Sequence, residues 1–162
     1  MKIRIGQGID VHQLIADIPL VIGGVSIPYS RGSKGHSDGD VLYHAIVDAI
    51  LGALSLGDIG LHFPSDDDRW KDVRSVKFLE QAQYLMKEKG FVAVNIDTTI
   101  IIQDPRLSSY IEEMRENISS ILSISIDSVS VKATTTDHLG FTGSGEGIAA
   151  MAVALLAETD EN

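Results

Sequence analysis

The chain has 162 residues, 44% of them hydrophobic and 22% charged, which predicts one soluble globular domain (residues 1–162) with a buried core. It contains no cysteine, so disulfides and thiolate metal ligands are excluded and any metal ion must be held by histidine and carboxylate side chains. Nucleic-acid binding is disfavoured by a formal net charge of −10, because such binding depends on neutralising phosphates with basic residues.

The first predicted element is a strand over residues 2–12. Apolar and polar residues alternate there, with one face formed by Ile3, Ile5, Ile9 and Val11 and the other by Lys2, Arg4, Gly6, Gly8, Asp10 and His12. The chain enters this strand without the apolar core of a signal peptide, and no apolar run approaches the roughly 18 residues of a membrane span. The expected location is therefore the cytoplasm, or the plastid stroma if a transit peptide has been removed.

Asp10 and His12 lie on the same face of this strand, roughly 6–7 Å apart, so both can bind one ion. His44 lies on a helix predicted over about residues 40–56. Two imidazoles and one carboxylate are the ligands that zinc takes when its fourth position stays open for chemistry. The alternative is a polar strand end, because sequence alone does not place His44 near the other two residues.

The predicted helix carries Asp40, His44 and Asp48 on one face, at i, i+4 and i+8. We expect Asp48 to hydrogen-bond the ring nitrogen of His44 that does not bind metal. A buried histidine paired with a neighbouring aspartate explains this segment equally well.

The remaining elements predict an α/β fold with helices covering one side of a sheet. They are a hairpin over 19–28 turned at Gly23-Gly24, a helix over 74–89 ending at Gly90, a strand over 96–102, a helix opened by a capping box at Ser109 and Glu112, and a strand over 129–134. Residues 147–156 are ambiguous, because their composition favours a helix while a short apolar run is also typical of a central strand.

Two loops are candidate anion sites. The loop 35–40 precedes a helix and carries His36 and Ser37 as donors, although Asp38 or Gly39 in a simple helix-capping loop accounts for it as well. The run from Lys132 to Asp137 follows a strand with three threonines, which is typical of a phosphate cradle or of an ordinary strand end.

Taken together and in order, these segments resemble the 2-C-methyl-D-erythritol 2,4-cyclodiphosphate synthase family of the non-mevalonate isoprenoid pathway. The matching motifs extend over nearly the whole chain. They are Arg4-Ile-Gly-x-Gly-x-Asp-Val-His12, Ile22-Gly-Gly-Val-x-Ile-Pro28, His36-Ser-Asp-Gly-Asp-Val41, His44-Ala45, Leu56-Gly-Asp-Ile-Gly60, Phe63-Pro64, Lys132-Ala-Thr-Thr-Thr136, Leu139-Gly-Phe-Thr-Gly143 and Gly145-Glu-Gly147.

The resemblance implies a lyase that cyclises 4-diphosphocytidyl-2-C-methyl-D-erythritol 2-phosphate and releases CMP. It also implies a homotrimer that packs its sheets around a central axis, with active sites between subunits, and a strand as the last element. Zinc is implied at Asp10, His12 and His44, with a second ion, magnesium or manganese, at Asp137.

The resemblance also assigns substrate contacts. The catalytic residues implied are His36 and Thr135. The methylerythritol phosphate arm is assigned to His36, Ser37, Asp58, Ile59 and Gly60, with Phe63, Pro64 and Asp67 in the mobile neighbourhood of that arm. Asp10 and His12 are also implied as substrate contacts. The cytidine pocket is assigned to the stretches 102–108 and 133–136, with contacts from Ile102, Asp104, Arg106, Leu107, Ser108, Ala133, Thr134, Thr135 and Thr136. Asp137 and Phe141 are implied as further substrate contacts.

Four positions depart from the usual pattern of that family. Arg106 replaces a lysine and keeps the charge. Asp137 replaces a glutamate, which leaves direct contact with the second metal open. Ser144 and Met151 replace two charged residues that line an axial cavity in many relatives, so we expect this cavity to be more apolar and to bind isoprenoid diphosphates poorly.

Two other functions are compatible with parts of the chain. A zinc phosphohydrolase would use the same three ligands but leaves the threonine run unexplained. A non-enzymatic trimeric binding module has no need of an open metal site.

Overall fold

The computed structural model describes residues 2–35, 37–64, 66–70 and 73–159. Two sheets form. The larger has five strands in the order β4-β1-β7-β5-β6, and the smaller is the hairpin β2-β3. The strands are β1 (Ile3–Ala16), β2 (Leu20–Ile22), β3 (Val25–Ile27), β4 (Arg31–Ser33), β5 (Phe91–Ile101), β6 (Val129–Thr134) and β7 (Gly147–Glu158). The helices are α1 (Val41–Ala53), α2 (Ile59–His62), α3 (Val76–Glu88), α4 (Ile111–Leu122) and α5 (Gly140–Gly143), with 3-10 turns at Asp68–Trp70 and Ile126–Ser128.

The large sheet is antiparallel except for β5 and β6, which run parallel. The crossover between them passes through α4, as a parallel pair requires. β5 and β6 therefore end at the same edge of the sheet, where Ile101 and Thr134 are register partners.

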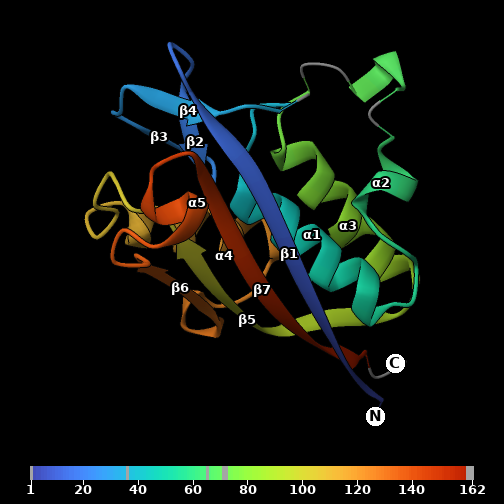
Figure 1. The fold of residues 1–162 in the computed structure, drawn as a ribbon. Coiled ribbons are helices and arrows are strands. Elements are labelled where there is room, and N and C mark those ends of the chain that lie inside the picture. The colour runs from blue at the N-terminus through green and yellow to red at the C-terminus, as the bar shows by residue number, and fades with distance from the viewer. Residues whose placement is uncertain (1, 36, 65, 71–72, 160–162) are drawn as a thin grey trace.

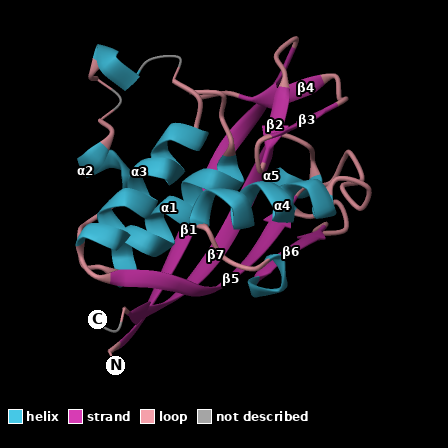
Figure 2. Cartoon of the chain, turned by 180° about the vertical axis from the view of Figure 1, so that it is seen from behind, coloured by secondary structure: helices cyan, strands magenta, loops and turns pink. Residues whose placement is uncertain are grey.

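Helices α1, α3 and α4 cover one face of the sheet (Figures 1 and 2). Within the described part of the chain no helix covers the opposite face, where the side chains of Ile3, Ile5, Ile9 and Val11 are each at least half exposed. The alternation predicted for residues 2–12 is confirmed, and the isoleucine face is the one that this chain leaves uncovered.

The glycines on the other face of β1 permit close contact with α1. A Cβ atom added at Gly8 would lie 2.0 Å from the carbonyl oxygen of Ala45, and one at Gly6 would lie 1.9 Å from that of Ala49. Only glycine fits such a contact between a strand and a helix backbone. The contact holds α1 directly over β1.

Most predicted elements are confirmed, including the hairpin, the helix that ends before Gly90 and the strand at 129–134. Residues 147–156 form a strand, against their helical propensity. The capping box was wrong: Tyr110 precedes α4, and no side chain caps that helix. The loop predicted after residue 30 contains a short strand, β4, that pairs with a longer β1 than expected. None of the helices among the described residues combines the length and apolarity needed to cross a bilayer.

Candidate metal centre and substrate pockets

The structure brings together Asp10 and His12 from β1 and His44 from the first turns of α1. The Asp10 Oδ2 atom lies 2.7 Å from His12 Nε2 and 3.0 Å from His44 Nδ1, and the two ring nitrogens lie 3.2 Å apart. These three residues form the one group of three or more metal-ligating side chains found within the described residues.

The donor set fits a zinc ion. Tetrahedral ligand atoms at bonds of about 2.0–2.1 Å lie about 3.3 Å apart, close to the observed separations. The Nδ1 atom of His12 lies 2.8 Å from the carbonyl oxygen of Lys34, which only accepts hydrogen bonds. The Nδ1 atom of His12 therefore carries the hydrogen, and the lone pair of its Nε2 atom is free for a metal.

Charge pairing within the cluster outweighs burial. Burial raises the pKa of Asp10, but the hydrogen bonds with His12 and His44 lower it by more. The net result is a pKa lowered from 3.8 to about 2. Burial lowers the pKa of His12, and the hydrogen bond to Asp10 raises it above 6.5. Without metal the cluster thus behaves as an ion pair, and Asp10 is ionised at neutral pH.

The predicted bond between Asp48 and His44 was wrong. Asp48 accepts a hydrogen bond from the backbone N–H of Ile59 at 2.7 Å and so holds the start of α2. The outer nitrogen of His44, Nε2, instead lies 2.9 Å from Ser75 Oγ and 3.3 Å from Ser37 Oγ. Asp40, rather than Asp38 or Gly39, caps α1.

A pocket of about 340 Å³ opens beside the metal cluster. Six of its lining residues were predicted from the sequence, namely His12, Ser37, His44, Ile59, Gly60 and Phe63. Gly35 belongs to the predicted anion loop 35–40, and sequence reasoning missed the remaining three, Lys34, Trp70 and Phe78. The ring of Phe63 packs against that of Trp70 in a T-shaped arrangement, with a centroid distance of 4.9 Å, and against the tilted ring of Phe78 at 4.6 Å. The pocket therefore has an aromatic wall.

Three residues predicted for this region do not line the pocket. Asp58 caps α2 through Leu61 N–H, and Asp67 binds the guanidinium of Arg69. Pro64 is half-buried outside the pocket. His36, predicted as catalytic, lies outside the described residues.

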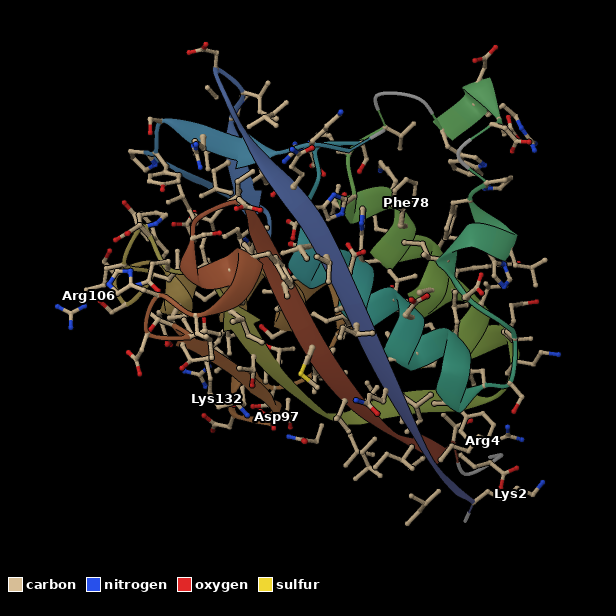
Figure 3. The ribbon with its side chains drawn as sticks, viewed as in Figure 1. Lys2, Arg4, Phe78, Asp97, Arg106 and Lys132 are labelled. Carbon is tan, nitrogen blue, oxygen red and sulfur yellow. The ribbon has the colours of Figure 1, made fainter. Side chains whose placement is uncertain are left out.

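A second pocket, of about 620 Å³, lies where β5 and β6 end. Its wall contains the predicted residues Ile102, Asp104, Arg106, Leu107, Ser108, Ala133, Thr134 and Thr135, together with Gln103, Pro105 and Ile111. The two pockets share no lining residue. Figure 3 shows Phe78, from the first pocket, and Arg106, from the second, on opposite sides of the chain.

Three other predicted substrate contacts, Thr136, Asp137 and Phe141, do not line this pocket. The Thr136 hydroxyl donates to the carbonyl oxygen of Leu139 at 2.6 Å, inside a turn. Asp137 is exposed and accepts a hydrogen bond from Thr135 at 3.3 Å. Phe141 packs on Gly147 and lines a further pocket with His12.

Lys132 does not face either of these pockets. Its ammonium group pairs with the Asp97 carboxylate at 2.6 Å, on the exposed face of the sheet (Figure 3). It therefore does not serve as the positive charge of the threonine loop within one chain.

A mixed sheet with an Asp–His–His cluster beside one pocket and a threonine loop beside another defines an α/β enzyme with a candidate metal centre. Comparison with known proteins identifies the family. The sequence profile of the YgbB family matches residues 3–157. A 2-C-methyl-D-erythritol 2,4-cyclodiphosphate synthase of Alkaliphilus oremlandii is 57% identical over 151 residues, 93% of this chain and 96% of the relative.

Solved structures agree. IspF of Plasmodium falciparum, in a CDP complex, superposes with a TM-score of 0.86 at 38% identity, over 98% of this chain and 97% of that one. The bifunctional IspDF of Campylobacter jejuni superposes with a TM-score of 0.94 at 42% identity; the match covers 98% of this chain but 43% of that longer one. The chain therefore belongs to the YgbB family of 2-C-methyl-D-erythritol 2,4-cyclodiphosphate synthases, and it is an enzyme of the lyase class.

Proposed function

We propose that this enzyme converts 4-diphosphocytidyl-2-C-methyl-D-erythritol 2-phosphate to 2-C-methyl-D-erythritol 2,4-cyclodiphosphate and CMP, within isoprenoid biosynthesis. The names of its relatives support this reaction. The observation that carries the proposal is the Asp10–His12–His44 cluster at the wall of the 340 Å³ pocket. Such a cluster matches a substrate whose reacting groups are both anionic.

The proposed reaction is an intramolecular displacement. An oxygen of the 2-phosphate bonds to the β-phosphorus while the bond from that phosphorus to the oxygen bridging to CMP breaks, and CMP leaves with the electron pair. The nucleophile is already ionised, so no general base is required. Orientation by the two pockets supplies much of the rate, within the roughly 7–11 kcal/mol available to well-oriented intramolecular reactions.

The repulsion between the two phosphates must be offset, because the chain itself is acidic. Zinc held by Asp10, His12 and His44, and magnesium or manganese held by Asp137, would supply positive charge there as Lewis acids. The fit of Asp137 is weaker, since its carboxylate is exposed and engaged by Thr135.

The two pockets divide the substrate. The pocket at the ends of β5 and β6 has the size and the hydroxyl donors for cytidine diphosphate, and Thr135 would lie beside the reacting phosphate. The Plasmodium relative was solved in complex with CDP, which supports a cytidine diphosphate as ligand. The pocket beside the metal cluster takes the methylerythritol phosphate arm, with Ser37 and, by resemblance, His36 as donors.

We further propose that the working enzyme is a homotrimer. Within one chain the two pockets are separate and share no lining residue. The uncovered face of the sheet also exposes apolar side chains such as Ile5, which is 70% exposed, and Ile9. Burying this face between copies would bring the cytidine pocket of one subunit to the metal cluster of the next.

The reaction is tested by incubating purified protein with the substrate and Mg²⁺ and following ³¹P resonances with and without a zinc chelator. We expect CMP and a cyclic diphosphate, lost on chelation and restored by zinc. Release of inorganic phosphate would instead identify a phosphohydrolase, and the absence of turnover in zinc-loaded protein would refute the proposed reaction.

A further inference from the structure

The ring nitrogen of His44 that points away from the metal cluster begins a buried chain of hydrogen bonds. His44 Nε2 lies 2.9 Å from Ser75 Oγ, and the Ser75 hydroxyl lies 2.5 Å from Asp38 Oδ1. Asp38 Oδ1 also accepts the backbone N–H of Ser75 at 3.1 Å. Ser75 is fully buried, so these contacts are shielded from water.

The direction of each hydrogen bond follows from counting hydrogens. The Ser75 hydroxyl has one hydrogen, and an ionised carboxylate only accepts, so that hydrogen is donated to Asp38. The lone pairs of Ser75 Oγ are then left to accept from His44 Nε2–H and from the Ser37 hydroxyl, 3.1 Å away. Neutral His44 therefore carries its hydrogen on Nε2.

This hydrogen position determines which atom of His44 is free for a metal. With Nε2 protonated, the lone pair lies on Nδ1, the atom that points to Asp10 Oδ2 at 3.0 Å. The opposite tautomer would put a hydrogen between His44 Nδ1 and the other ligand atoms and would block the site. The ring also packs against Phe78, at a centroid distance of 5.8 Å, which restricts its rotation.

We propose that Ser75 and Asp38 are positioning residues that fix the tautomer and orientation of His44 for metal binding. This inference rests on the proposed metal site. A structural role as a helix cap does not account for Ser75, because its side chain makes no capping bond to α3 and its backbone is already helical. The chain His44–Ser75–Asp38 joins α1, α3 and the loop before α1 behind one ligand.

The test compares Ser75→Ala, Ser75→Thr and Asp38→Asn by zinc competition against a chromophoric chelator. Partners of metal-bound histidines typically contribute about 10- to 100-fold in affinity, and we expect a loss of that size for Ser75→Ala. Ser75→Thr keeps the hydroxyl and should restore most of the affinity. Asp38→Asn, which removes only the charge of the acceptor, should lose less than Ser75→Ala.

The matched control is Thr98→Val, which removes another buried hydroxyl with a 3.0 Å hydrogen bond, to the carbonyl oxygen of Ser130. It should lower the urea midpoint and leave zinc affinity unchanged. The second readout is the long-range ¹H–¹⁵N spectrum of zinc-loaded protein, in which the Nε2 hydrogen of His44 should exchange slowly with water in the wild type and faster in Ser75→Ala.

Wild-type zinc affinity in Ser75→Ala, together with an unchanged exchange rate of the His44 Nε2 hydrogen, would overturn the positioning role alone. Failure of the wild-type protein to bind zinc would overturn the metal site and the positioning role with it. Zinc binding with the expected affinity differences, in a protein that does not form the cyclic product, would support the positioning role and refute the proposed reaction.

Discussion

Replacing Gly8 by alanine should separate the metal ligands without touching any of them. The added Cβ would lie 2.0 Å from the carbonyl oxygen of Ala45, whereas ordinary contacts begin at 3.4 Å. Helix α1 must therefore retreat by about 1.4 Å at this point, at a cost of about 1–3 kcal/mol for an overpacked core. His44, the neighbour of Ala45, moves away from Asp10 and His12 with the helix.

The expected result is a lower urea midpoint and weaker zinc binding. With a slope of about 2 kcal/mol per molar urea, the midpoint should fall by about 0.5–1.5 M. Metal sites tolerate distance errors of only about 0.2 Å, so we expect zinc affinity to fall at least about tenfold. Synthase turnover should fall by about 100-fold, the typical effect of a 1 Å misplacement.

Gly52→Ala is the matched control, because it makes the same change within α1 where the nearest atom outside the helix, Gln7 O, lies 3.9 Å from the new methyl group. It should leave zinc affinity unchanged and stabilise the protein by up to about 1 kcal/mol through helix propensity. A Gly8→Ala protein with wild-type midpoint and zinc affinity would refute the close helix–strand contact as the feature that sets the ligand spacing.

Three further predictions address the rest of the molecule. Asp40→Asn replaces one carboxylate oxygen of the buried α1 cap by an amide NH₂ group, which then faces a backbone N–H of the β2–β3 turn. This change should lower the free energy of unfolding by about 1–3 kcal/mol in urea titrations. An unchanged urea midpoint would contradict this expectation. In chelator-treated protein, Asp10 raises the pKa of His12 above 6.5 despite burial. The ion pair therefore stabilises the folded protein fully below pH 6.5, and this stabilisation is lost as the pH rises through the folded-state pKa of His12. The thermal midpoint should fall over that range in wild-type protein but not in His12→Gln, and zinc, which needs neutral histidine, should reverse the trend. Ile9→Asp should convert the proposed trimer to a folded monomer in sedimentation experiments, whereas Tyr84→Asp, on the exposed surface of α3, should not. An Ile9→Asp protein that remains trimeric would exclude the uncovered sheet face as the interface.

Site residues that are close together in the sequence can be predicted better than residues that come together only when distant elements pack. Asp10 and His12 are two apart on a strand, and their shared face follows from backbone periodicity alone. Asp48 is a helix neighbour of His44, yet Ser75, 31 residues away, takes the hydrogen bond because α3 packs against α1. The strand at residues 147–156 follows from pairing on both sides, which overrides the helical propensity of its alanines.

Some members of the site left no readable pattern. Trp70 and Phe78 enter the pocket wall from a 3-10 turn and a helix, and an aromatic residue in either setting is usually explained by core packing. The short strand β4 has only three residues, including a glycine, so its pairing with β1 depends on the partner rather than on its own composition.

The position of β7 in the sheet has a consequence for the order of folding. This strand is last along the chain among the described strands, but it is the central one in space, pairing with β1 over eleven register positions and with β5 on its other side. Before residue 147 is synthesised, β1 with β4 and β5 with β6 have no strand to join them. A nascent chain would thus hold two incomplete half-sheets with exposed edges, and such long-range pairing is slow and prone to aggregation. We expect the enzyme to acquire its sheet in one late, cooperative step rather than progressively from its amino-terminal end.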